Sequence, residues 1–179
     1  MRACTLTSTV AIGLTSAALG QCTPTWYPMG LNADAEVRSL AVLSNGDLVA
    51  AGEFDTTWGA VANFIARWNS SSWSPMGAGV GPIPFALKAV SGGLVAGGWY
   101  QNFNQLYGWV SRWNGSTWSD VGTHFDGYVF SLATLPNGDL VAAGGFGTAG
   151  GTPASRIARW DGTSWQALGP GLDSWVYAL

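Results

Sequence analysis

Short apolar runs separated by polar, glycine-rich turns recur along this chain at a nearly constant distance. The run Leu48–Gly52 returns at 94–98 and at 140–144, in two steps of 46 residues. The Ala-Arg-Trp run that ends at Trp68 returns as Ser-Arg-Trp and again as Ala-Arg-Trp, in steps of 45 and 47 residues. Self-similarity at a period of this length is typical of repeat architectures, so the period bears on the fold class before composition does.

Each repeat has the pattern of four short strands. The first is expected over 37–42, and an Asn-Gly turn at 45–46 leads into the second over 48–53. Asn-Gly suits a two-residue hairpin, because both central residues of that turn need a positive φ. After a longer and variable loop, the third strand ends at Trp68 and a second tight turn returns the chain through Trp73. Two hairpins per repeat predict an antiparallel four-strand meander, which is one blade of a β-propeller.

The repeats also predict the domain organisation. An outer strand is expected at 25–30, followed by blades over 36–77, 83–122 and 128–169 and by the inner strand of a partial blade at 175–179. Closed propellers hold about four to eight blades. The sequence therefore predicts an all-β propeller of about three complete blades in an incomplete ring, as a fragment of a longer chain. The alternative is that several copies oligomerise to close one ring.

Residues that recur in every repeat are expected to be structural. The tryptophans have the size to fill the gaps between neighbouring sheets. An arginine offers five donors in a fixed fork, and we expect the repeated arginines to bind carbonyls or carboxylates between blades. The structural set consists of Arg67, Trp68, Trp73, Arg112, Trp113, Trp118, Arg159, Trp160 and Trp165.

The third repeat shows the pattern most completely. It runs from Leu-Pro-Asn-Gly-Asp-Leu-Val-Ala-Ala-Gly-Gly-Phe-Gly through Arg-Ile-Ala-Arg-Trp-Asp-Gly-Thr-Ser-Trp, within 135–171. This pattern resembles the kelch-like and Rax-type propeller repeats of bacterial exported proteins and fungal cortical polarity markers. The first two repeats depart from it after Gly52 and Gly98, where the Gly-Phe-Gly run is missing. The resemblance implies a propeller fold and says little about function, because such propellers serve mostly as extracellular scaffolds.

Composition and the first twenty residues favour an exported, folded protein. The chain is 47% hydrophobic and 9% charged, which is far from the composition of a disordered chain. Residues 1–20 place Arg2 before an apolar run that ends in small residues, which is typical of a signal peptide. No later stretch approaches the ~20 apolar residues of a transmembrane segment. We therefore expect a secreted, periplasmic or cell-surface protein in which Cys22 has no cysteine partner.

Charge and side-chain chemistry exclude several classes of function. The net charge is −3 and no basic cluster is present, so nucleic acid is not an expected partner. The single histidine, His124, has no nucleophile beside it in a recognisable pattern, and no ligand spacing predicts a metal or another cofactor. The sequence favours a non-enzymatic binding or scaffold module. A fragment of a secreted oxidase-like or glycosidase-like enzyme, with its catalytic residues outside this chain, stays open as the alternative.

Aromatic residues that break the period are the candidates for ligand binding. Several stand beside the amide side chains of 101–105, and aromatic faces next to amides suit stacking on a sugar ring. The same aromatics could instead cap the blade ends by packing against one another. The binding partner is expected to be a glycan, a peptide or a protein. The candidates are Trp58, Trp99, Tyr100, Phe103, Tyr107 and Trp109.

Overall fold

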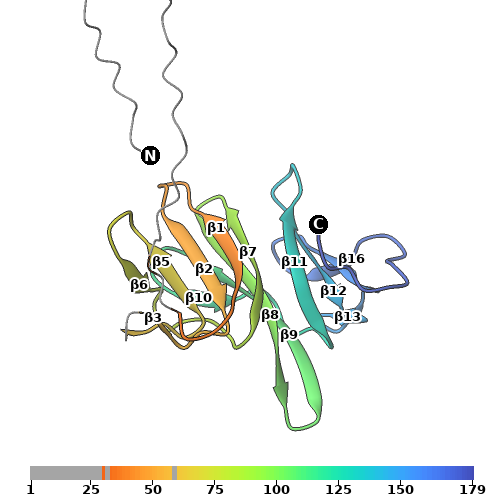
Figure 1. The fold of residues 1–179 in the computed structure, drawn as a ribbon. Coiled ribbons are helices and arrows are strands. Elements are labelled where there is room, and N and C mark those ends of the chain that lie inside the picture. The colour runs from red at the N-terminus through yellow and green to blue at the C-terminus, as the bar shows by residue number, and fades with distance from the viewer. Residues whose placement is uncertain (1–29, 31–32, 58–59) are drawn as a thin grey trace, which may run out of the picture. The chain divides into compact units, whose positions relative to one another are not determined.

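The computed structural model describes residue 30, residues 33–57 and residues 60–179 (Figure 1). The described residues form three four-stranded antiparallel sheets and two small two-stranded sheets, which confirms the all-β class. Residues from 33 onward belong to one compact unit. The expected signal peptide at 1–20 and the expected outer strand at 25–30 lie outside the described residues, except for Gly30.

Each large sheet is formed by one repeat, and its strands are ordered as they are in the chain. The first sheet contains β1 (Val37–Val42), β2 (Leu48–Gly52), β5 (Ile65–Trp68) and β6 (Trp73–Pro75). The second contains β7 (Pro84–Val90), β8 (Gly93–Asn102), β9 (Gln105–Trp113) and β10 (Trp118–Asp120). The third contains β11 (Tyr128–Thr134), β12 (Leu140–Gly145), β15 (Ile157–Trp160) and β16 (Trp165–Ala167). The predicted four-strand antiparallel units are therefore confirmed.

The first turn of the first and third sheets differs in type from the expected two-residue hairpin. The Leu43 N–H donates to the Asp47 carbonyl at 2.8 Å, and the Gly46 N–H donates to the Leu43 carbonyl at 2.9 Å. Within this loop only Gly46 has a positive φ, of 87°. This is a three-residue loop in which a left-handed glycine follows a type I turn. Asn45 stabilises this loop through its side chain, because its Oδ1 accepts the Asp47 N–H at 3.1 Å.

The second turn of each sheet is organised by one side-chain acceptor. In the third sheet, Asp161 Oδ1 accepts the Ser164 N–H at 2.9 Å, the Thr163 N–H at 2.9 Å and the Thr163 hydroxyl at 2.8 Å. These bonds, the one from Ser164 most of all, lower the pKa of Asp161 from 3.8 to about 2. Asn69 and Asn114 accept the corresponding backbone bonds in the other two sheets.

We expect the carboxyl group of Asp161 to titrate near pH 2 and not near 3.8. Because the folded-state pKa is depressed, the contribution of this turn to stability is present above pH 3.8 and is lost as the pH falls toward 2. The shift of the side-chain carboxyl carbon in an NMR acid titration measures the midpoint. Asp161→Asn should preserve the turn, as asparagine does in the other repeats, and should abolish this titration. A wild-type midpoint at 3.8 would contradict the assignment.

The repeated tryptophans join consecutive sheets. The indole N–H of Trp118 in the second sheet donates to the Met76 carbonyl of the first repeat at 3.0 Å. The indole N–H of Trp165 in the third sheet donates to the Val121 carbonyl of the second repeat at 2.8 Å. Each acceptor directly precedes a glycine, and the next repeat's tryptophan packs there: a Cβ added to Gly122 would lie 2.7 Å from the Trp160 ring.

Residues 175–179 differ from the expected inner strand, since no strand is assigned there. The segment nevertheless lies against β11, because the Leu179 N–H donates to Ser131 Oγ at 3.0 Å. The Leu87 N–H donates in the same way to Ser39 Oγ, also at 3.0 Å, where β7 lies against β1. A strand assignment needs a ladder partner, and the described residues give this segment isolated hydrogen bonds instead.

Candidate functional site

The second repeat carries a long β-hairpin that the other two repeats lack. Strands β8 and β9 stay paired over nine residue pairs, from Leu94 with Trp113 to Asn102 with Gln105. At the same place the first and third repeats form only the short ribbons β3 (Thr56–Thr57) with β4 (Ala60–Val61) and β13 (Thr148–Ala149) with β14 (Thr152–Pro153). Figure 1 shows the hairpin extending beyond the other strands of its sheet.

One side chain distinguishes the repeats with short ribbons from the repeat with the long hairpin. In the third repeat, Asp126 Oδ1 accepts the Gly147 and Thr148 N–H groups at 2.7 and 2.8 Å, and thereby holds the ribbon in its short form. In the first repeat Asp34 does the same, and the hydrogen bond from the Thr56 N–H is the main cause that lowers the pKa of Asp34. The corresponding residue of the second repeat is Gly81, which has no carboxylate to offer.

The base of the hairpin holds a compact aromatic group. Tyr100 and Tyr107 face each other across the strands, with ring centroids 5.3 Å apart in a stacked arrangement. Both rings contact the edge or face of His124, and the Tyr100 hydroxyl lies 3.3 Å from His124 Nε2. The Tyr107 hydroxyl donates to Gln105 Oε1. We call Tyr100, Tyr107 and His124 the hairpin aromatic group.

The backbone of His124 and of the residue after it fixes the position of this histidine, since the His124 carbonyl accepts the Gly150 N–H at 3.1 Å. Phe125 exchanges two hydrogen bonds of 3.0 Å with Gly108 of β9, and its side chain is 1% exposed. His124 is not among the residues predicted to bind a ligand, because one histidine in a loop has no pattern that indicates its partners. The amide side chains of 101–105 are exposed at the far end of the hairpin, where Phe103 is 94% exposed.

The candidate tryptophans do not share one environment. Trp109 is 6% exposed, and its indole N–H donates to the Pro82 carbonyl at 3.0 Å. Its ring lies over Gly81, where an added Cβ would approach it to 2.9 Å, so Trp109 fills space that a larger residue would need. Trp99 is partly buried and makes an edge contact with Tyr128 at 4.9 Å. Trp58 lies outside the described residues.

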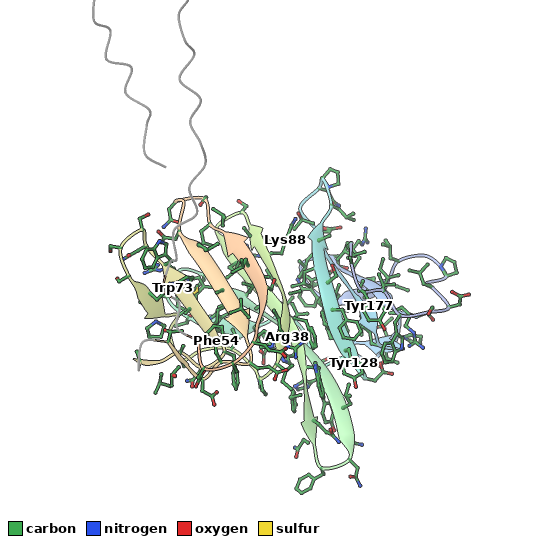
Figure 2. All side chains as sticks on the ribbon, viewed as in Figure 1. Arg38, Phe54, Trp73, Lys88, Tyr128 and Tyr177 are labelled. Atoms are coloured by element: carbon green, nitrogen blue, oxygen red, sulfur yellow. The ribbon has the colours of Figure 1, made fainter. Side chains whose placement is uncertain are left out.

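A second group of packed side chains, most of them aromatic, lies on the first strands of the three sheets. Each of these strands has a β-bulge at the same place, and the extra residues are Arg38, Phe85 and Phe130. The Arg38 guanidinium lies 4.6 Å from the centroid of Phe85, Phe85 contacts Phe130 at 5.3 Å, and Phe130 stacks on Tyr177 at 5.2 Å. Figure 2 labels Arg38 and Tyr177, the first and last of these residues. Bulges re-aim side chains out of the normal alternation. Alignment of the repeats could have revealed this column, but its mixture of residue types conceals it.

The repeated arginines reach turns of their own sheets. The contacts are Arg67 to Asp47 at 3.7 Å, Arg159 to Asp139 at 3.4 Å, and Arg112 to the Ser91 carbonyl at 2.9 Å. These contacts stay within one sheet, whereas the sequence had led us to expect contacts between neighbouring repeats. The register of the strands explains these contacts. In the first and third sheets the arginine is paired with a residue of the second strand, and that residue comes two positions after the aspartate of the turn. The side chain therefore meets its own turn first.

Other kinds of site have little support in the part of the chain that the structure describes. There, no cluster of three or more histidine, cysteine or acidic residues is arranged to hold a metal ion. The same residues include no helix with the length and hydropathy that a membrane crossing requires. No family model matches this sequence and no curated protein matches it. The chain is therefore described by its structure, as an all-β protein of repeated four-stranded antiparallel sheets.

Proposed function

We propose that this chain supplies blades of a secreted β-propeller of the kelch-like type, which acts as a non-enzymatic glycan-binding module. Three observations support the propeller arrangement. Every repeat is a four-stranded meander, consecutive sheets are joined by the same indole-to-carbonyl bond, and the first strands of the sheets lie against one another. The signal-like segment at 1–20 supports export.

The observation that carries the binding role is the hairpin that extends from the second repeat. Its two stacked tyrosines are partly exposed, and Gln105, which accepts the Tyr107 hydroxyl, connects them to the exposed amides of 101–105 toward the tip. A sugar ring offers apolar C–H groups for the first and hydroxyls for the second. His124 adds a ring nitrogen within reach of Tyr100, and this fixes the orientation of that phenol.

Binding by this hairpin can be tested on a glycan array. Wild-type protein should bind a defined set of glycans, and Tyr107→Ala should lose at least about tenfold in affinity for them, because an aromatic pair and its sugar contact are removed together. Val61→Ala is the matched control, since Val61 is 64% exposed on the corresponding ribbon of the first repeat and should have no effect. Wild-type protein that binds no glycan, or Tyr107→Ala that binds as wild type does, would overturn the proposal.

A further inference from the structure

Three Asn-Gly pairs stand in turns of this chain, and one of them has a different set of hydrogen bonds. The pairs at 45–46 and 137–138 lie in the first turns of the first and third sheets, and the pair at 114–115 lies in the second turn of the second sheet. All six residues are exposed. Asparagine before glycine readily loses ammonia, because glycine has no side chain that hinders attack of its backbone nitrogen on the asparagine side chain. The surroundings of each pair therefore decide which pair reacts.

The attacking nitrogen is hydrogen-bonded in two of the three pairs. The Gly46 N–H donates to the Leu43 carbonyl at 2.9 Å, and the Gly138 N–H donates to the Leu135 carbonyl at the same distance. The Gly115 N–H has no hydrogen-bond partner among the residues that the structure describes. A bonded N–H must give up its acceptor before it can lose its proton and attack. Of the three glycines, Gly115 therefore has the nitrogen that is free to react.

The carbonyl group of the Asn114 side chain is held by two backbone donors. Asn114 Oδ1 accepts the Ser116 N–H and the Thr117 N–H, each at 2.9 Å. Asn114 Nδ2 donates to the uncharged Thr117 hydroxyl at 3.2 Å. Negative charge develops on the carbonyl oxygen when a nucleophile adds to the carbonyl carbon, and donors at these distances stabilise that charge. The turn therefore lowers the barrier to addition at Asn114.

A carboxylate opposes the same step at the other two pairs. Asn45 Oδ1 accepts one backbone bond, from the Asp47 N–H at 3.1 Å, and Asn45 Nδ2 donates to Asp47 Oδ2 at 2.9 Å. Asn137 makes the corresponding contacts with Asp139, at 3.2 and 2.8 Å. A negative charge beside the reacting amide disfavours the anionic intermediate of the addition. Asn45 and Asn137 are therefore protected.

We propose that Asn114 is a site of spontaneous deamidation that its own turn promotes. The Gly115 nitrogen loses its proton to solvent and attacks Asn114 Cγ. The new N–Cγ bond closes a succinimide ring, the Cγ–Nδ2 bond breaks, and ammonia leaves with a proton from solvent. Water then opens the ring at one of its two carbonyl groups and produces aspartate or isoaspartate. This site is independent of the glycan-binding proposal.

The third repeat shows that aspartate fits this turn. Asp161 occupies the corresponding position, and its Oδ1 accepts the Thr163 and Ser164 N–H groups, both at 2.9 Å. Conversion of Asn114 to aspartate therefore adds one negative charge and preserves the turn. Isoaspartate adds a methylene group to the main chain, and this displaces the Asn114 N–H from the Thr117 carbonyl that it contacts at 3.2 Å.

Peptide mapping of the wild-type protein by mass spectrometry tests the proposal. The folded chain is incubated at mildly alkaline pH in isotopically labelled water, which marks deamidation that occurs during the incubation. Deamidation should be at least about tenfold faster at Asn114 than at Asn45 or Asn137. The same incubation in urea is the control, because the three pairs then react without their turns and their rates should converge. Equal rates in the folded chain, no reaction at Asn114, or the same difference in urea would overturn the proposal.

Asp161→Asn is the matched variant that should gain a reactive site. The substitution places an Asn-Gly pair in the corresponding turn of the third sheet, where the Gly162 N–H has no partner among the described residues. Residue 161 of this variant should deamidate at least about tenfold faster than Asn137 of the same repeat. Circular dichroism first establishes that the variant is folded. If residue 161 reacts no faster than Asn137 does, the turn does not promote the reaction and the proposal fails.

Discussion

Gly122→Ala is expected to destabilise the protein by about 3 to 5 kcal/mol, much more than the same change at most glycines. A Cβ at Gly122 would lie 2.7 Å from the Trp160 ring and 2.8 Å from the Trp165 ring, and both rings belong to the next sheet. The backbone at Gly122 also has a φ of +74°, which strains any residue other than glycine. The two indoles are held by neighbours, so the sheets must separate to admit the methyl group.

Gly169→Ala is the matched control for this prediction. Gly169 occupies the same position of the third repeat and has a similar φ of +68°, but no atom lies within 4 Å of an added Cβ. The control should therefore show only the backbone strain, about 1 kcal/mol. Urea unfolding followed by tryptophan fluorescence gives both values. Equal destabilisation by the two substitutions would show that contact between the sheets at Gly122 contributes nothing.

Trp165→Ala is expected to have the other large effect, a loss of about 3 to 5 kcal/mol. Trp165 is 2% exposed, contacts Phe125 at 4.9 Å and donates to the Val121 carbonyl at 2.8 Å. Trp165→Phe separates these contributions, because it keeps most of the ring but leaves the carbonyl without its donor, at a cost of about 1 to 3 kcal/mol.

The comparison for Trp165 is Trp175→Ala. Trp175 is 47% exposed, although its ring contacts Tyr128 and Phe130, so its removal should cost about 1 to 2 kcal/mol, less than the loss of the buried Trp165. Differential scanning calorimetry of the three variants and the wild type provides the measurement. The interpretation fails if Trp165→Phe is as stable as wild type, since the hydrogen bond between sheets would then have no energetic role.

The strands and turns that depend on residues close together in the chain could be predicted from the sequence. The period located all four strands of each sheet, because the turns at their ends depend on residues such as Gly46 and Asn69 that act within a few positions. The recurrence of the large tryptophans likewise indicated packing between sheets. The predicted type of the first turn was wrong. The same Asn-Gly pair fits loops of two and of three residues, and only the strand register decides between them.

The features that depend on contacts distant in sequence could not be predicted. No local pattern shows that His124 lies against Tyr100, since 24 positions separate them and Phe125 sets the approach. The partners of the repeated arginines depend on ladder register, and the bulged positions at Arg38 and Phe85 recur with the repeat but carry different residue types, which conceals them.

Departures from the repeat are concentrated in the second unit. Gly81 stands where the other repeats have an aspartate that holds a short ribbon, and the second repeat has the long hairpin instead. Gly93 stands where the others have an aspartate beside the repeated arginine, and among the described residues Arg112 forms no ion pair. Both departures replace a carboxylate of the repeat with glycine.

Nuclear Overhauser contacts across the two sheet boundaries test the stacking of successive repeats most directly. The packing of each repeat's tryptophan on the preceding repeat's glycine predicts contacts from the Trp113 ring to the Gly77 Hα protons and from the Trp160 ring to the Gly122 Hα protons. Both should be present in the folded chain at ordinary pH. If both rings show contacts only to residues of their own sheets, the repeats do not stack in this way and the account of the fold is contradicted.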